Sequence, residues 1–175
     1  KDQEDSDDDG LGNDCDIKEE TVNKSFSIIL LPDTQYYTDR MSDNPDNIYY
    51  KQMNWIIENR DKYNIEFVIH LGDITDNNKV GEWTIADKAH DMLDAQNIPY
   101  SMIPGNHDYL SSSCLKRNAT KFDDYFGPSR FQGKSWYGGH FGDSNVNNYS
   151  LFTAGAMDFL VVNLEYAPTK EALNW

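Results

Sequence analysis

The sequence has few basic residues and no long apolar run. Its 175 residues include 15 lysines and arginines against 30 aspartates and glutamates, a formal net charge of −15. This negative charge repels phosphate backbones and anionic lipids, so we expect no bulk binding to nucleic acid or membrane surfaces. The apolar runs, such as 28–31 and 159–162, are far shorter than the roughly 20 residues of a membrane-spanning helix. We therefore expect no transmembrane segment.

Cysteine is nearly absent as well. Cys15 and Cys114 are the only two. They could pair, but a disulfide needs Cα atoms about 4.4–6.8 Å apart, and spacing along the chain does not establish this distance. Their pairing stays open. The chain also begins without an initiator methionine or a basic and apolar leader, so we take it as a mature or partial form.

Acidic charge is concentrated at the start of the chain. Residues 1–20 carry ten acidic side chains and two lysines, about half of the net charge. This head has almost no apolar residues, whereas apolar runs and turn signals alternate from Ser25 onward. We therefore divide the chain into an acidic head and linker at 1–22 and a globular domain at 23–175. With 38% apolar and 13% aromatic residues overall, the chain can bury a core.

The domain alternates short apolar strands with amphipathic helices. Strands are expected at 26–31, 67–71 and 100–103, and helical stripes at 49–57 and 83–93. Strands that alternate with helices indicate βαβ units and a parallel sheet, hence an α/β fold. Residues 111–147 are expected to form a long loop with a short helix at 122–126. Two further strands at 148–152 and 159–163, joined by a turn near Gly155, and a final helix from Lys170 complete the prediction.

Polar clusters follow the ends of the three expected parallel strands. They are Asp33-Thr34-Gln35, Gly72 to Asp76, and Gly105-Asn106-His107-Asp108. The carboxyl ends of parallel strands share one sheet edge, where ligands bind in open α/β folds. Oxygen ligands that converge there favour a hard divalent cation. A single aspartate after a strand is more often a helix cap or Asx-turn, but three clusters in register favour a metal site.

The histidines differ in their expected environments. His107 lies within the third cluster, and we expect the neighbouring carboxylate of Asp108 to orient it so that it can protonate a leaving group. His70 lies inside a strand and is expected to be a hydrogen-bonded core residue. His90 lies on a helix between Asp87 and Asp91, and we expect it on a solvated face.

These motifs resemble those of the calcineurin-like metallophosphoesterases, over residues 26–175. The resemblance implies the βαβαβ half of a four-layer α/β/β/α sandwich and a dinuclear metal site with a bridging hydroxide as nucleophile. It implies that Asp73 bridges the ions, that Asp33 and Asn106 bind one each, and that His107 assists leaving-group departure with Asp108 as its partner. The two ions would be Mn, Fe, Zn or Mg, which such ligands do not distinguish.

The sequence departs from the family pattern at two places. Gln35 stands where many members carry histidine, and we expect its weaker amide oxygen to act as a metal ligand there. The family's later Gly-His-X-His motif is missing, since no histidine follows His140. We therefore expect the second half of the catalytic domain to be missing and this chain to have negligible turnover. We expect His140, which follows Gly138 and Gly139, to be a surface loop residue. A role as a substitute metal ligand is the less favoured alternative.

The acidic head has the ligand spacing of a calcium loop. Asp5, Asp7 and Asp9 occupy positions 1, 3 and 5, Gly10 follows at 6, the Leu11 carbonyl falls at 7, and Asp16 falls at 12. Residues 5–16 also resemble the end of a thrombospondin type 3 repeat, whose cysteine pairs upstream. The alternative is a solvated acidic tail. A calcium module of millimolar affinity predicts a secreted, extracellular or periplasmic protein.

The leading hypothesis is a metal-dependent hydrolase of phosphate esters. One alternative is a calcium-dependent surface or adhesion protein that uses the domain as a non-catalytic scaffold. The glutamine at position 35, where many family members carry histidine, favours this alternative. Another is a phosphate- or nucleotide-binding module. Monoester or diester preference and oligomeric state stay open.

Overall fold

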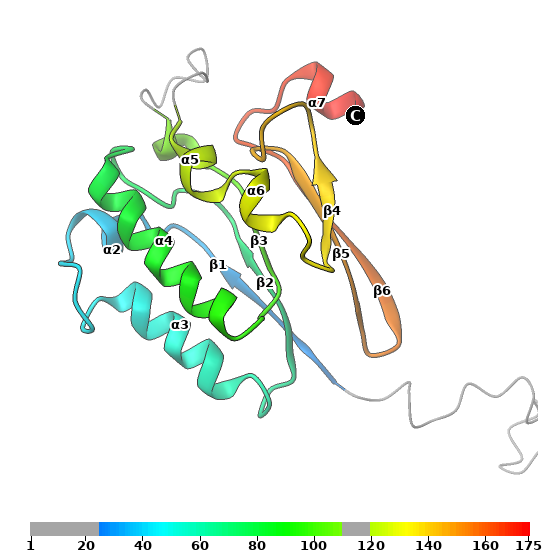
Figure 1. The fold of residues 1–175 in the computed structure, drawn as a ribbon, viewed down its shortest axis with the longest axis horizontal. Coiled ribbons are helices and arrows are strands. Elements are labelled where there is room, and N and C mark those ends of the chain that lie inside the picture. Colours follow the sequence, from blue (N-terminus) through cyan, green and yellow to red (C-terminus); the bar gives the residue numbers. More distant parts are fainter. Residues whose placement is uncertain (1–24, 110–119) are drawn as a thin grey trace, which may run out of the picture.

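The structure, a computed structural model, describes residues 25–109 and 120–175. Two sheets pack face to face, and helices cover the outer side of one of them (Figure 1). The expected calcium loop at 5–16, both cysteines and the boundary between the acidic head and the domain fall outside the described residues. Within those residues, no helix is long and apolar enough to cross a membrane.

Sheet A contains three parallel strands in the order β1-β2-β3. They are β1 (Ser27–Leu31), β2 (Ile65–His70) and β3 (Tyr100–Met102). Leu31 pairs with His70, and His70 pairs with Met102, so the three strands end level with one another. The polar segments that follow the strands therefore start from one edge of the sheet.

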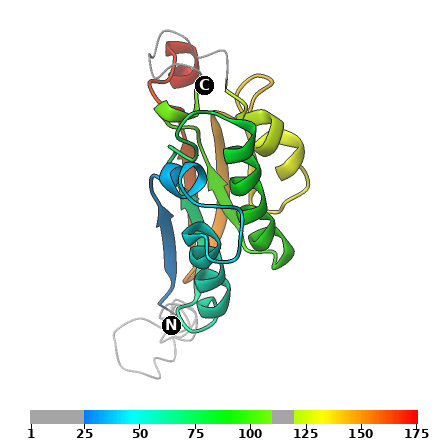
Figure 2. The same cartoon turned by 90° about the vertical axis from the view of Figure 1, so that its left-hand side faces the viewer.

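Helices α3 (Ile48–Asn59) and α4 (Val80–Ala95) cover one face of sheet A (Figure 2). The Asn47 side chain caps α3 by accepting a hydrogen bond from the Tyr49 amide at 2.9 Å. The predicted helical stripes face the core. Six of their members have no exposed surface: Tyr49, Met53, Trp83, Ala86, Ala89 and Leu93.

Sheet B contains three antiparallel strands in the order β4-β5-β6. They are β4 (Tyr137–His140), β5 (Asn148–Ala154) and β6 (Met157–Asn163). Gly155 and Ala156 form the two-residue turn between β5 and β6, with positive φ at both, as tight hairpins favour. Aromatic stacking joins the sheets, because the ring of Phe67 in β2 lies 4.4 Å, centroid to centroid, from that of Phe152 in β5.

The α/β fold class and the βαβαβ unit are confirmed. The region expected to be mostly loop is more ordered, because it contains α6 (Pro128–Phe131) and β4 besides the expected α5 (Phe122–Phe126). The sequence of β4 includes Gly138 and Gly139 and has no strand-like pattern; its pairing depends on β5. The ring of Tyr149 occupies the space where a Gly138 side chain would lie.

The described residues supply three of the four expected layers. The helix α7 (Lys170–Asn174) lies at one end of sheet B (Figure 1), where Trp175 contacts Phe141 and Tyr149. Several apolar side chains on the outer face of sheet B remain exposed among these residues, including Leu151, Leu160 and Val162.

Candidate functional site

The three predicted polar clusters start from the same edge of sheet A. Asp33 comes two residues after β1, Asp73 three residues after β2, and Asn106 four residues after β3. Because β2 is the central strand, Asp73 follows the strand that lies between the other two. The parallel topology thus gives Asp73 the central position among the three.

The backbone is unusual at both aspartates. Asp33 has a φ of 48° and Asp73 a φ of 50°. Both lie in the left-handed region, which residues other than glycine rarely adopt. Gly72 precedes Asp73 with a φ of 94°, and a Cβ there would lie 2.7 Å from the Gly105 nitrogen. The loops after β2 and β3 are therefore in backbone contact, which glycine at both positions permits.

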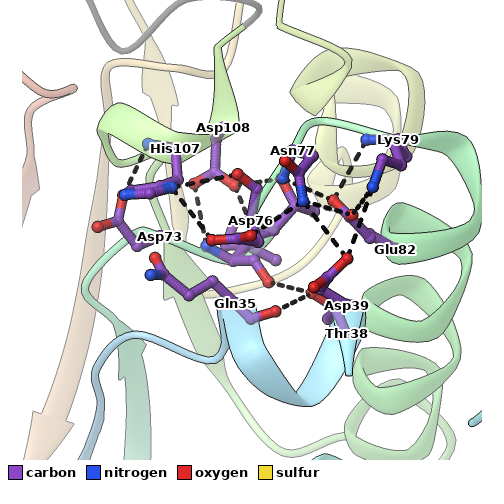
Figure 3. A network of polar contacts seen from close by, with 12 residues as sticks. Gln35, Thr38, Asp39, Asp73, Asp76, Asn77, Lys79, Glu82, His107 and Asp108 are labelled. Atoms are coloured by element: carbon purple, nitrogen blue, oxygen red, sulfur yellow. Dashed lines mark hydrogen bonds and ion pairs between the residues drawn. The ribbon is translucent and has the colours of Figure 1, made fainter. Parts of the chain in front are cut away.

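Gln35 contributes an unpaired oxygen to this edge. It is the first residue of α2 (Gln35–Asp39), an element that the sequence did not predict, and it is only 8% exposed. Its Oε1 is buried and has no hydrogen-bond partner among the described residues. Figure 3 shows its amide end pointing toward Asp73. A buried oxygen acceptor without a partner is costly, and a bound cation would satisfy it.

The predicted ligands fit a divalent metal in kind but are few. They comprise two carboxylates, Asp33 and Asp73, and two amides, Gln35 and Asn106. No group of three or more His, Cys, Asp or Glu side chains suited to holding a metal occurs within residues 25–109 and 120–175. Amide oxygens would therefore have to contribute to any site built from these side chains alone.

His107 is held by two aspartates, Asp73 and Asp76. No role was predicted for Asp76. His107 lies in the short 3-10 helix η1 (Asn106–Asp108). Its backbone amide donates to Asp73 Oδ1 at 3.0 Å, and its Nδ1 lies 3.1 Å from the carbonyl oxygen and 3.3 Å from Oδ1 of Asp76 (Figure 3). A carbonyl oxygen only accepts, so Nδ1 carries a proton. The signal available in the sequence was Asp76 itself, at the end of the second cluster.

Asp108 does not orient His107, so that expectation is wrong. Its carboxylate is fully buried and turned into the fold. It accepts hydrogen bonds from the amides of Ile74, Thr75 and Gly105, at 2.7–3.0 Å, and from the Thr75 hydroxyl at 2.8 Å. Burial raises the pKa of Asp108 to about 7, against the lowering effect of these hydrogen bonds. Asp108 thus joins the loops after β2 and β3; a catalytic role for it stays a prediction.

A polar network continues outward from Asp76 (Figure 3). Asn77 donates from its side chain to Asp76 at 2.9 Å and from its backbone to Glu82 at 2.9 Å. Glu82 is only 4% exposed, and Lys79 and Asp39 lie at the outer end of the network. The first turn of α4 therefore helps to fix the segment that contains Asp76.

The other histidines make no hydrogen bond to the predicted metal ligands within the described residues. His70 is buried and hydrogen-bonded, as predicted: Gly72 N–H donates to its Nδ1 at 3.2 Å, and its Nε2 lies 2.9 Å from the Thr34 hydroxyl. The expectation that His90 is solvated is wrong, because its side chain is fully buried in α4, one turn beyond Ala86. His140 lies in β4 rather than a loop, with Nδ1 2.7 Å from the Tyr137 hydroxyl.

A parallel sheet whose carboxyl edge carries oxygen ligands and a positioned histidine is suited to metal-assisted hydrolysis. Comparison with known proteins identifies the particular group: the chain belongs to the calcineurin-like phosphoesterase family, whose model matches residues 26–172. It is also similar to the "Uncharacterized protein YvnB" of Bacillus subtilis (strain 168), with 32% identity over 151 residues. The match covers 86% of this chain but only 11% of that protein.

Proposed function

We propose that this chain provides a site for hydrolysis of phosphate esters at the carboxyl edge of sheet A. The observation that carries the proposal is His107, which Asp73 and Asp76 hold on the edge where the unpaired Gln35 oxygen lies. Family membership supports the reaction class. The geometry supports the location.

In this proposal Asp33, Gln35, Asp73 and Asn106 would hold two divalent metal ions, and Asp73 would contribute to both. The ions would supply an activated water as nucleophile and would neutralise charge on the phosphoryl oxygens. The central place of Asp73 in the strand order supports the shared role.

His107 and Asp76 would then act on the leaving group. With Nδ1 protonated against Asp76, the His107 ring presents Nε2 to the site. A proton at Nε2 makes the ring an imidazolium, which the Asp76 carboxylate stabilises, and this proton can pass to the departing alkoxide. The side chain of His107 is 35% exposed, so a substrate can reach it.

Manganese binding by the full chain tests the proposed site, and hydrolysis tests the expectation that this chain has negligible turnover. The measurement uses equilibrium dialysis with Mn²⁺ in excess Ca²⁺, so that calcium-type sites are filled, and an alkyl phosphate monoester and diester as substrates, because their poor leaving groups need a proton. We expect Asp73→Ala to abolish specific Mn²⁺ binding, and His107→Ala to leave binding in place while lowering any wild-type hydrolysis about 100-fold. Mn²⁺ binding that Asp73→Ala leaves unchanged would refute the site.

A non-catalytic scaffold is the second candidate. It is favoured by the scarcity of His, Cys, Asp and Glu side chains grouped for metal binding among the described residues, and by glutamine at position 35. In that case the wild-type chain would be folded but would show no specific Mn²⁺ binding.

We also propose that residues 5–16 bind Ca²⁺ and that the protein works outside the cytoplasm. The support is the register of Asp5, Asp7, Asp9 and Asp16 with the Leu11 carbonyl. The family match begins at residue 26, beyond this segment. Calorimetric titration with Ca²⁺ tests the loop: binding should disappear in Asp5→Ala and survive Asp2→Ala, which lies outside the register.

A further inference from the structure

A second set of buried polar contacts fixes the loop that carries His107, this time from sheet B. The loop after β3 spans residues 103–109. Its Pro104 carbonyl accepts a hydrogen bond from the Tyr166 amide at 3.3 Å, and Met102, just before it, accepts one from Asn148 Nδ2 at 3.1 Å. Both donors lie in or just after the strands of sheet B.

The shortest of these contacts involves Glu165. The Tyr109 hydroxyl, at the end of the loop, donates to Glu165 Oε2 at 2.6 Å. Glu165 Oε1 accepts from Asn147 Nδ2 at 3.0 Å, and the Glu165 amide donates to Asn147 Oδ1 at 3.0 Å. Tyr109, Asn147 and Glu165 are 6%, 2% and 8% exposed, so the cluster is shielded from water.

The cluster is more than inter-sheet packing, because a buried carboxylate is costly unless its hydrogen bonds are made. A short, charge-assisted bond from a phenol fixes position more tightly than apolar contact does. Tyr109 directly follows η1, which contains Asn106 and His107. A shift of Tyr109 would therefore move both residues relative to Asp73, which lies in the separate loop after β2.

We infer that Glu165 is a positioning residue that acts through Tyr109, so that sheet B sets the place of Asn106 and His107. The inference rests on the proposed function in giving those two residues their roles. The loop after β2 holds the loop after β3 on the side of sheet A, through Asp73 and through the Ile74 and Thr75 amides that bind Asp108, and Glu165 holds it from sheet B. The carboxylate touches none of the predicted metal ligands in the described contacts.

Hydrogen exchange of the full chain without added metal tests the inference directly. Glu165→Ala and Tyr109→Phe should each raise amide exchange in 103–109 about tenfold, the change that loss of one stabilising contact produces. Glu165→Gln, which keeps an oxygen acceptor for Tyr109, should restore most of the protection. The matched control is Asn145→Ala. The Asn145 side chain is also buried but bonds to Phe126 and Tyr137, away from the loop, and the variant keeps the backbone carbonyl that accepts from Asn148.

The inference is overturned if Glu165→Ala leaves exchange in 103–109 at the wild-type rate, or if Asn145→Ala raises it equally. Mn²⁺ affinity gives a second readout: Glu165→Ala should weaken it about tenfold and Glu165→Gln should restore it. If the wild-type chain binds no Mn²⁺, the proposed function fails while the exchange result still decides the role of Glu165.

Discussion

At the scale of single residues, Asp76 makes the contact that orients the His107 ring. We expect Asp76→Asn in the Mn²⁺-loaded chain to lower kcat about 100-fold, because the imidazolium loses its stabilising carboxylate. The melting temperature should change little, since the Asn77 and Glu82 contacts persist. Steady-state kinetics on an alkyl phosphate monoester, whose poor leaving group needs a proton, measures the effect.

Asp39→Asn is the matched control for this prediction. Asp39 belongs to the same network, through Asn77 at 3.4 Å and Lys79 at 3.6 Å, but no contact joins it to His107 in the described structure. Equal losses of kcat in the two variants would show that the network, rather than the Asp76 carboxylate, matters.

His90 gives a prediction about stability and pH. It is enclosed by Tyr49, His70, Tyr100 and Phe126, and burial lowers its pKa to about 3. The charge of nearby Arg130 lowers it further. The unfolded chain therefore binds more protons between pH 6.5 and 3, so the stability that His90 contributes is complete above pH 6.5 and is lost as pH falls.

We expect His90→Leu to remove this loss. Relative to wild type, the free energy of unfolding of the variant should rise by up to about 1.4 kcal/mol for each pH unit below 6.5. Leucine also removes the contacts of His90 Nδ1 with the Ala86 carbonyl at 3.0 Å and the Tyr49 hydroxyl at 3.5 Å, so the test is the change in the stability difference between pH 8 and pH 5 and not its value at one pH. Urea denaturation at pH 8 and pH 5 measures the difference, and parallel pH profiles would contradict the prediction.

At the scale of elements, the loops after β2 and β3 depend on glycine. A Cβ on Gly105 would lie 2.2 Å from Asp73 Oδ1 and 2.3 Å from its nitrogen. Gly105→Ala should therefore push the two loops apart and destabilise the fold by about 1–3 kcal/mol, with a loss of Mn²⁺ affinity. Urea denaturation and dialysis measure both effects.

Gly81 supplies the opposite case for comparison. It lies in the first turn of α4 with nothing within 4 Å of the place where a Cβ would be. Gly81→Ala should stabilise the protein by about 0.5–1 kcal/mol, because glycine loses more conformational freedom in a helix than alanine does. If both substitutions changed the free energy of unfolding in the same direction, the close contact between the loops would not explain the need for Gly105.

At the scale of the whole molecule, sheet B has an apolar outer face. Leu151 pairs with Leu160 across the β5–β6 ladder, and these residues are 50% and 61% exposed; Val162, on the same face, is 55% exposed. A continuous apolar face binds hydrophobic dyes. We expect the native chain to enhance the fluorescence of 1-anilinonaphthalene-8-sulfonate, and Leu160→Lys with Val162→Lys to reduce this while circular dichroism stays the same.

Local patterns predicted most of the elements and the residues of the candidate site, but not α2, α6 or β4. The apolar stripes predicted α3 and α4, the hairpin turn was marked by Gly155, and the polar clusters identified Asp33, Asp73 and His107. Such features depend on residues within a few positions of one another. For this reason periodicity and motif spacing alone were sufficient to predict them.

Contacts between distant residues decided the rest. The partner of the His107 ring is Asp76, 31 positions away, rather than its neighbour Asp108, because the backbone amides of the adjoining loop bind the Asp108 carboxylate. His90 is buried because α4 lies against α3 and α5, which its flanking aspartates do not indicate. Motif positions at the strand ends thus predict which groups lie at the sheet edge. Their contacts with one another depend on how the elements pack, because hydrogen-bond partners come from distant parts of the chain.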